Sequence, residues 1–464
     1  MELTTALICG LLVAVLAFLW RLRDRTPSGS RLPPGSLGWP LIGESIAFAL
    51  NKTAFFKKRH DKYGQIFKTR IFGRNVVRVF GMDNVRKVIY GENRIVRSSY
   101  PASVLALVGN QSVSMMHGEE HKEKKRQLMK FLNPDFFNSH TPALYRTISQ
   151  RIQEWKESPA IDLHHECRRL FVNLAAKFLI NIDISDAAVA ELAEQLQIFM
   201  DNMFCLPWNI PGFGFYKAIK AKERMRQIIA SSLTQTENNN KSEMEFSSVL
   251  QGLCSTSGDD DVSKNVILLD SIIDLLFAGA ETVTSAGFSL AYQLAKHDDV
   301  MDKLRHEIAS LDLKDTDDVI SARDIQPMKY VNAVVKETLR LLPPVGGAFR
   351  TALESFELDG FTIPKGWSVS FGIRDTHNRD PVINDPMTFN PDQWLTNTAD
   401  SFAYLPFGGG ARVCPGQAYA KMILKLFTVE FARSCSIDIV QDSDLSFWPT
   451  PRPSGQMLVS IRKC

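Results

Sequence analysis

The chain has 464 residues, of which 45% are hydrophobic and 23% are charged. That balance allows a large buried core, which excludes a disordered, collagen-like or small disulfide-stapled protein. Lys and Arg number 54 against 51 Asp and Glu, and this formal charge of +3 is too small to indicate a nucleic-acid partner. The seven cysteines form no CxxC pair, so no disulfide framework or Cys-rich zinc site is expected.

The N-terminus predicts a membrane anchor. Residues 3–20 form an uncharged apolar run, and Arg21, Arg23 and Arg25 follow it directly. Such a run is at the short end of what crosses the roughly 30 Å of hydrocarbon. A secretory signal, the alternative, carries its positive charge before the apolar run, and positive flanks stay cytosolic. We expect a transmembrane anchor over 1–20, a basic, Pro-rich linker over 21–38 and a cytosolic domain over 39–464.

The body of the chain predicts a mainly α fold with minor β sheets. Short β-branched runs with glycine turns lie between about 40 and 95, and again between 346 and 372. Most windows from 119 to 345 have helical spacing of apolar residues. A helix is expected over 417–432, with closing strands after it. No GxGxxG follows a strand, so a dinucleotide fold is not expected.

The strongest motif is residues 407–416, FGGGARVCPG. Three successive glycines let the backbone approach a flat, bulky group. Arg412 can neutralise an anionic group and favour the thiolate form of Cys414. A helix begins just after Cys414 and directs its amide groups toward the sulfur. A thiolate in this setting is a suitable axial ligand for haem iron.

A second motif is Glu337-Thr338-Leu339-Arg340. Spacing i,i+3 puts Glu337 and Arg340 on one helix face. Exposed pairs of this kind contribute little to stability. Apolar neighbours make a buried structural ion pair the expected outcome here: Val334, Val335, Leu339, Leu341 and Leu342.

The third motif, residues 278–282, lies within a long apolar helical pattern from about 263 to 296. Gly279 weakens the helix, and Thr282 can bond a carbonyl one turn earlier, so a local distortion is expected. Glu281 and Thr282 together form a suitable acid–alcohol pair for proton delivery. The alternative is that Thr282 only satisfies its own helix while Glu281 faces solvent.

These motifs occur in the order and at the spacing of the cytochrome P-450 family, the haem-thiolate monooxygenases, which the whole chain resembles. The resemblance implies the cytochrome P-450 fold, with Cys414 as the proximal ligand of haem b. Phe407 and Arg412 are then cofactor-binding residues. Electrons would come from NADPH through a flavoprotein, cytochrome P-450 reductase.

The resemblance also implies roles for the other two motifs. Glu337 and Arg340 would stabilise the core beneath the haem. Glu281 and Thr282 would deliver protons during dioxygen activation.

The sequence departs from the family pattern at two places. Gln393 stands where an Arg usually completes a triad with the Glu–Arg pair, which puts core stability in question. His121 and Lys125 stand where a Trp and an Arg usually reach a haem propionate. Arg350 is a further candidate partner for a propionate.

A run of basic residues borders the expected docking surface for the reductase. A solvated helix face is the ordinary interpretation of such a run, and docking is what the resemblance implies. The residues are Lys122, Lys124, Lys125, Arg126 and Lys130, with Lys421 and Lys425 after the cysteine.

Several strings look most like the animal retinoic-acid hydroxylases: residues 78–86, 100–104, 356–367 and 373–377. Residues 211–215 and 414–416 resemble plant hydroxylases of sterols, diterpenoids and triterpenoids. An isoprenoid substrate is the shared expectation. Leu105 stands where the retinoic-acid hydroxylases carry an Arg, which favours a neutral isoprenoid. The expected substrate pocket contains Tyr100, Val104, Phe204, Phe277, Ala278, Val345 and Gly346.

We therefore expect a monooxygenase of the endoplasmic reticulum membrane that hydroxylates a hydrophobic isoprenoid, either retinoic-acid-like or a sterol, diterpenoid or triterpenoid. Two alternatives stay open at this point. One is a haem-thiolate isomerase or dehydratase that needs no reductase. The other is a non-catalytic protein that binds a lipophilic ligand.

Overall fold

The computed structural model describes residues 10, 14–15, 31–40, 42–239, 266–311, 320–379, 383, 385–396 and 404–464. The predicted anchor lies almost wholly outside the described residues, as do residues 21–30. Among the residues that are described, no helix is long and apolar enough to cross a membrane. The chain divides into two compact units, Met1–Ser99 with Gly347–Thr376, and Tyr100–Gly346 with His377–Cys464.

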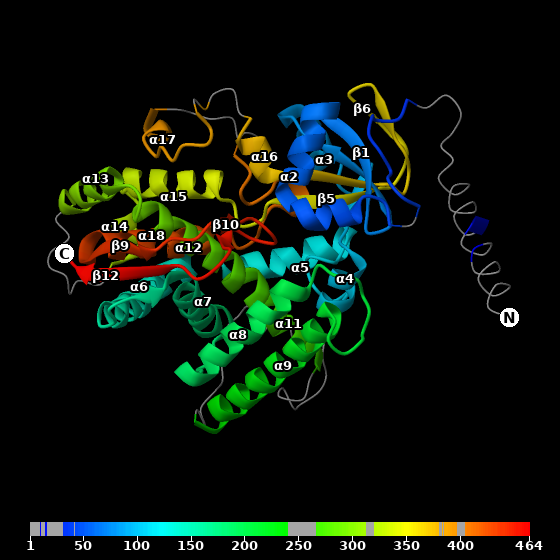
Figure 1. The fold of residues 1–464 in the computed structure, drawn as a ribbon. Helices are drawn as coiled ribbons and strands as arrows, with labels where there is room; N and C mark the ends of the chain where they lie inside the picture. Colours follow the sequence, from blue (N-terminus) through cyan, green and yellow to red (C-terminus); the bar gives the residue numbers. More distant parts are fainter. Residues whose placement is uncertain are drawn as a thin grey trace. The chain divides into compact units, whose positions relative to one another are not determined.

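The first unit contains a five-stranded sheet in the order β1-β2-β8-β5-β3. Figure 1 labels β1 and β5 of this sheet. Only the β2–β8 pair is parallel. Strands from the two β-branched regions of the sequence, 40–95 and 346–372, therefore pair in one sheet. The strands are β1 (Ile66–Ile71), β2 (Arg74–Val79), β3 (Val96–Ser98), β5 (Gly347–Ala352) and β8 (Ser368–Gly372), with the hairpin β6 (Phe356–Leu358) and β7 (Phe361–Ile363).

Two helices of this unit were not predicted, α2 (Ser45–Tyr63) and α3 (Met82–Tyr90). Phe48 and Phe55 of α2 are seven residues apart, about two turns, and both are buried. Neither phenylalanine lies in a β-branched run, so the search for such runs in this region does not indicate the helix.

The second unit is mostly helical. Its helices are α4 (Ala102–Val108), α5 (Gly118–Phe131), α6 (Pro134–Lys156), α7 (Leu163–Leu174), η1 (Ala175–Ile180), α8 (Asp186–Asn202), α9 (Gly214–Asn239), α11 (Val266–Leu276), η3 (Phe277–Glu281), α12 (Thr282–Leu294), α13 (Asp298–Ala309), α14 (Ala322–Ile325), α15 (Lys329–Leu341), α17 (Gln393–Thr396), η4 (Gly410–Arg412) and α18 (Gln417–Ser434). Helix α16 (Ile373–His377) spans the boundary between the two units. The strands are β4 (Ile161–Asp162), β9 (Cys435–Gln441) and β12 (Leu458–Lys463), with the pair β10 (Leu445–Ser446) and β11 (Arg452–Pro453).

Helix α12 is the centre of this unit's core and packs on α7, α15 and α18 (Figure 1). A side chain on Gly287 would come within 2.3 Å of the Phe171 ring, so only glycine allows α7 to approach this closely. Helices α11, η3 and α12 follow one another without a break, and η3 has π-helical hydrogen bonding. The mainly α fold with minor sheets and the expected distortion near Gly279 are therefore confirmed.

Candidate active site

The cysteine motif forms a tight loop at the start of α18. The Cys414 N–H donates to the Phe407 carbonyl at 2.9 Å and closes the loop. Gly408 and Gly410 adopt left-handed φ values of 70° and 60°, which any side chain would strain. The glycines of the motif therefore serve the loop geometry that presents Cys414.

Three effects act on the Cys414 thiol. Burial, the largest, raises its pKa, while the Gly416 N–H and the Lys125 ammonium lower it. The cationic group that acts on the thiol is Lys125, which the sequence assigned to a haem propionate; the role expected of Arg412 stays a prediction. Arg412 Nη2 donates to the Met116 carbonyl at 2.7 Å, and it lies 2.9 Å from His117 Nδ1. Binding to a metal deprotonates a cysteine, so a raised pKa in the metal-free chain is compatible with a ligand role.

The other candidate cofactor residues divide between the two units. On α5, His121 is buried one turn before Lys125, whose Nζ donates to the Ala411 carbonyl at 3.0 Å. Phe407 is half-buried, and Lys421 lies 5.2 Å from its ring centre. Arg350 belongs to the first unit, where it is buried in an ion pair with Glu92 at 2.8 Å. The charge of Arg350 is therefore already balanced within that unit.

The residues of the second unit fit a haem group. Helix α12 is buried along most of its length, yet its first residue, Thr282, retains accessible surface, as do Phe277 and Ala278 of the preceding η3. Such an apolar strip suits the face of a macrocycle. Cys414 can ligate the iron, and Lys125 and Arg412 can pair with carboxylates.

One alternative from the sequence was that Glu281 faces solvent, and the structure contradicts it. Glu281 is 1% exposed and forms a two-point ion pair with the buried Arg168, Nε to Oε2 at 3.2 Å and Nη2 to Oε1 at 3.3 Å. Arg168 also donates to Gln197 Oε1 at 2.8 Å. The carboxylate oxygens of Glu281 therefore accept hydrogen bonds from a buried guanidinium, and the two side chains compensate one another in the core.

Thr282 bonds its own helix, as the sequence allows. Its Oγ1 donates to the Ala278 carbonyl at 2.7 Å, within the π-helical segment. The hydroxyl proton is therefore occupied, while the oxygen lone pairs stay available to accept a hydrogen bond.

Glu337 and Arg340 form a fully buried two-point ion pair on α15, with both N–O distances 2.8 Å. Arg340 also donates to the carbonyls of Pro386 and Thr388 at 2.7 and 3.1 Å. The carbonyl oxygen of Arg340 lies 2.9 Å from Nδ1 of His377, within hydrogen-bonding distance. The pair thus connects α15 to the segment that precedes α17.

The role of the missing arginine at Gln393 is taken by other donors. Trp394 Nε1 donates to Glu337 Oε2 at 2.8 Å, and the Asn390 N–H donates to Oε1 at 2.9 Å. These neutral donors supply hydrogen bonds where an arginine would supply charge. Sequence reasoning missed Trp394, although it stands next to Gln393 in the motif.

The expected substrate-pocket residues have different surroundings. Phe277 packs edge-on to Phe199 with ring centres 6.3 Å apart, and Phe204 lies 5.1 Å from Trp448. Val104 is buried in the core. Tyr100 is half-buried, whereas Ala278, Val345 and Gly346 are exposed.

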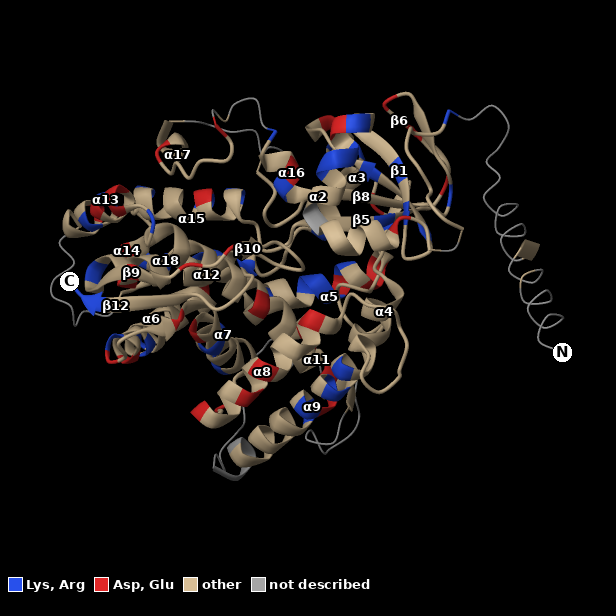
Figure 2. Cartoon of the chain, in the orientation of Figure 1, with Lys and Arg blue, Asp and Glu red and all other residues tan. Residues whose placement is uncertain are grey.

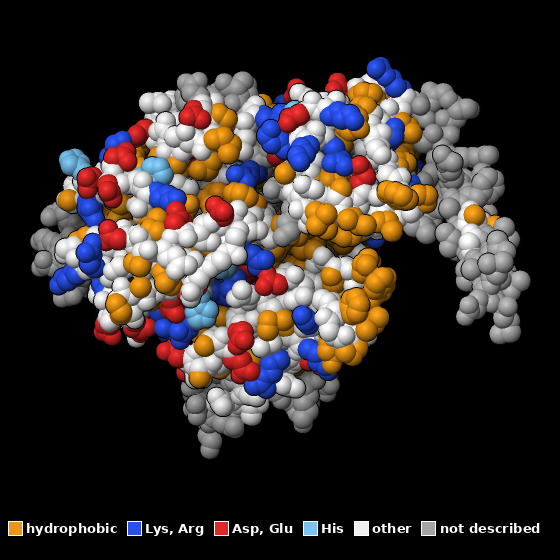
Figure 3. All heavy atoms as spheres, viewed as in Figure 1, with side chains coloured by type: hydrophobic (Ala, Val, Ile, Leu, Met, Phe, Trp, Pro, Cys, Tyr) orange, Lys and Arg blue, Asp and Glu red, His pale blue; other side chains and the backbone are white. Residues whose placement is uncertain are grey.

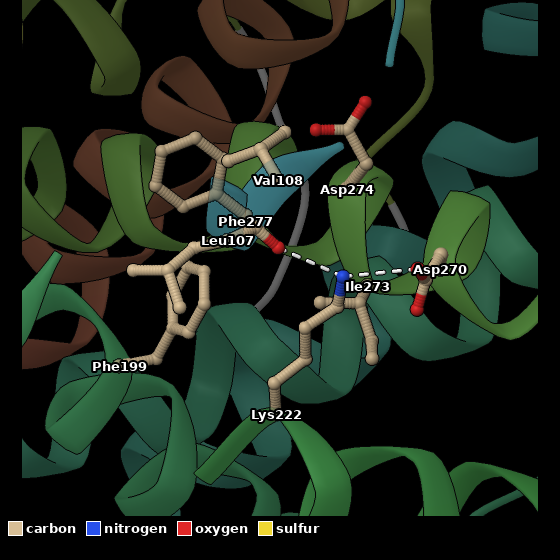
Figure 4. Close-up of a pocket in the computed structure, with 8 residues that line it drawn as sticks. All are labelled: Leu107, Val108, Phe199, Lys222, Asp270, Ile273, Asp274 and Phe277. Carbon is tan, nitrogen blue, oxygen red and sulfur yellow. Dashed lines mark hydrogen bonds and ion pairs between the residues drawn. The ribbon is translucent and has the colours of Figure 1, made fainter. Parts of the chain in front are cut away.

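Figure 4 shows a cavity beside Phe277 that contains polar groups the sequence reasoning did not assign. Lys222 of α9 and two acids of α11, Asp270 and Asp274, contribute them. The sequence does carry a signal for these polar groups: two acids, one turn apart, stand within the mostly apolar sequence of α11.

The chain belongs to the cytochrome P-450 family, whose family model matches residues 33–460. It is a monooxygenase, and its cofactor is haem with thiolate ligation of the iron and electrons from NAD(P)H through a reductase partner.

Among curated proteins, cytochrome P-450 26B1 of Xenopus tropicalis is 33% identical, over 97% of this chain and 91% of that protein. Cytochrome P-450 26A1 of Gallus gallus is 34% identical, over 93% and 92%. Among solved structures, the cyanobacterial CYP120A1 with retinoic acid bound matches with a TM-score of 0.83 and 28% identity, over 94% of this chain and all of that one. The expected branch of the family is confirmed.

Proposed function

We propose that Cys414 is the proximal iron ligand and that the protein hydroxylates a retinoid-like isoprenoid. The observation that carries this is the second unit's combination of a loop-presented thiol, cationic donors from α5 and the same loop, and an accessible apolar strip at Phe277, Ala278 and Thr282. The likeness to a structure with retinoic acid bound supports the substrate class. A sterol or terpenoid is the second candidate.

The test is NADPH-driven turnover of the full chain with a reductase. Retinoids, sterols and terpenes would be offered in parallel, and oxidised products would be identified by mass spectrometry. Oxidation of retinoids above the other classes supports the proposal. Turnover of sterols alone would replace the retinoid assignment.

Haem, when bound, supplies the dioxygen chemistry, and the chain's own residues control proton movement. Thr282 oxygen can accept a hydrogen bond on the accessible strip. Glu281 is occupied by Arg168, so proton delivery through this carboxyl requires that the ion pair open. Thr282 is therefore the better placed of the two in this arrangement.

Replacing Thr282 with Ala is expected to uncouple the enzyme, because the hydroxyl that passes the proton is lost. Positioned proton transfer contributes roughly 10²–10⁴-fold, so product per NADPH should fall by about tenfold or more while NADPH consumption continues. Measuring product and NADPH together tests this. Thr284→Ala, on the buried side of α12, is the matched control. Unchanged coupling in Thr282→Ala would remove the relay role.

A lysine group near the cysteine loop supports reductase docking in the second unit. Burial lowers the pKa values of Lys421 and Lys425, and Lys336 lowers both further, so the three charges lie close together. Within the described residues no carboxylate pairs with any of the three. Helix α5 adds further Lys and Arg residues (Figure 2). An acidic partner would relieve this repulsion.

Changing Lys336 and Lys425 to Gln should slow electron transfer from the reductase by about tenfold at low ionic strength. Added salt should reduce the difference, because screening weakens the attraction in the wild type. Stopped-flow reduction of the haem measures both effects. Lys177→Gln, on η1, is an exposed control. A reduction rate in the double variant equal to that of the wild type at low salt would contradict docking here.

We also propose attachment to the endoplasmic reticulum membrane, with the catalytic domain in the cytosol. The anchor predicted over 1–20 supports this, as does an exposed apolar loop of the second unit. Leu206, Trp208, Ile210 and Phe213 are each about half exposed. Figure 3 shows hydrophobic side chains gathered over α4 on the same unit. Apolar and aromatic side chains of this kind favour the membrane interface.

A further inference from the structure

The cavity of the second unit lies where α4, α8, α9 and α11 meet (Figure 4). Its central space has room for about one water molecule, so the cavity can hold a single polar group such as a hydroxyl. Its walls are Leu107, Val108, Phe199, Lys222, Asp270, Ile273, Asp274 and Phe277.

The ammonium group of Lys222, the cation of this cavity, already makes two hydrogen bonds. Lys222 Nζ donates to the Leu107 carbonyl at 2.8 Å and to Asp270 Oδ2 at 2.9 Å. Asp270 also accepts from Arg226 Nε at 2.7 Å. With two of its three protons engaged, Lys222 has little remaining capacity for a ligand anion.

Asp274, by contrast, can accept further hydrogen bonds. Among the described side chains, Asp274 accepts one hydrogen bond, from Ser112 Oγ at 2.6 Å. A carboxylate offers about four lone-pair positions, so most of its accepting capacity is unused. A ligand group that donates a hydrogen bond to Asp274 therefore suits this cavity.

We propose that Asp274 binds the hydroxyl group of a neutral isoprenoid alcohol and selects the alcohol over the corresponding carboxylate. The inference rests on the proposed function and narrows its substrate class. A hydroxyl donates to Asp274, whereas a carboxylate meets two aspartates and a lysine that is already paired.

Ionisation of Asp274 agrees with this selectivity. Burial raises its pKa to about 6, against the lowering effects of Ser112 and Lys222, while Asp270 adds to the rise. At pH 7.5 the group is mostly ionised and repels an anionic ligand. Leu105 of α4, at the position where the retinoic-acid hydroxylases are expected to carry an Arg, is uncharged.

Helix geometry connects this cavity to the accessible strip. Asp274 and Ala278 are four residues apart, as are Ala278 and Thr282. At about 1.5 Å per residue in an α-helix, and with a smaller rise through the π-helical η3, Asp274 lies about 10–12 Å along the axis from Thr282. The oxidised carbon should therefore lie about 10–12 Å from the hydroxyl that Asp274 holds, a separation available in an extended isoprenoid chain.

The test uses two probes that share one skeleton, retinol and retinoic acid. Each is titrated into the haem-loaded full chain at pH 7.5, and binding is followed by the shift of the haem absorption band. The wild type should bind retinol at least tenfold more tightly, as expected of a hydrogen bond to a charged group. Asp274→Asn should bring the two affinities within about threefold, and Asp274→Leu should weaken retinol alone by about tenfold or more. Asp302→Asn, at an exposed position on α13, is the control.

A thiolate-type spectrum of the reduced carbonyl complex in every variant shows that the fold and the proposed function stand independently of this result. Tighter binding of retinoic acid by the wild type would overturn the selectivity. An unchanged affinity ratio in both Asp274 variants would overturn the role of Asp274. Absence of the thiolate-type spectrum in the wild type would instead remove the proposed function itself.

Discussion

Replacing Cys414 with Ala is expected to abolish the thiolate-type spectrum of the reduced carbonyl complex and all NADPH-dependent oxidation. A thiolate ligand at this position would supply the iron with the electron density that favours O–O cleavage, and the neutral Ala side chain would not. Cys167 and Cys435 are buried in the core, away from the loop, so neither thiol can replace Cys414 as a ligand. The difference spectrum with and without carbon monoxide is the measurement.

The loop geometry makes this test specific. The hydrogen bond that closes the loop uses the backbone of Cys414, so Ala preserves it. Cys205→Ala, at a half-buried thiol of the same unit, is the matched control and should keep the wild-type spectrum. A wild-type spectrum in Cys414→Ala would assign the ligand to another residue.

Replacing Glu337 with Ala is expected to cost about 3–5 kcal/mol of folding free energy, the usual result of breaking a buried ion pair. Arg340 would remain fully buried without its counter-charge, and the donors of Trp394 and Asn390 would lose their acceptor. Urea unfolding of the haem-loaded protein, followed by intrinsic fluorescence, measures the change.

The surface supplies a matched comparison for this change. Glu223 forms the same i,i+3 pairing with Lys220, but both side chains are about half exposed. Solvent screens that pair, so Glu223→Ala should leave the unfolding curve almost unchanged. Similar small effects of the two substitutions would show that burial does not strengthen the Glu337–Arg340 pair.

The sequence could predict that Glu281 of the third motif lies near a helix distortion, because Gly279 and Thr282 are local signals for it. Its partner could not be predicted, because Arg168 lies 113 residues earlier and nothing in either segment specifies the other. The same holds for Ser112 and Asp274, 162 residues apart.

The sequence by itself determined the class of protein, the cysteine loop and the Glu337–Arg340 pair. Each of these depends on motifs whose residues stand at fixed short spacing within one helix or turn, where backbone geometry leaves few arrangements. Only the tertiary structure decided that Lys125 stands beside the thiol, that Trp394 serves in place of an arginine, and that Asp274 faces a cavity. Those contacts join elements distant in the chain, and packing of the whole core selects them.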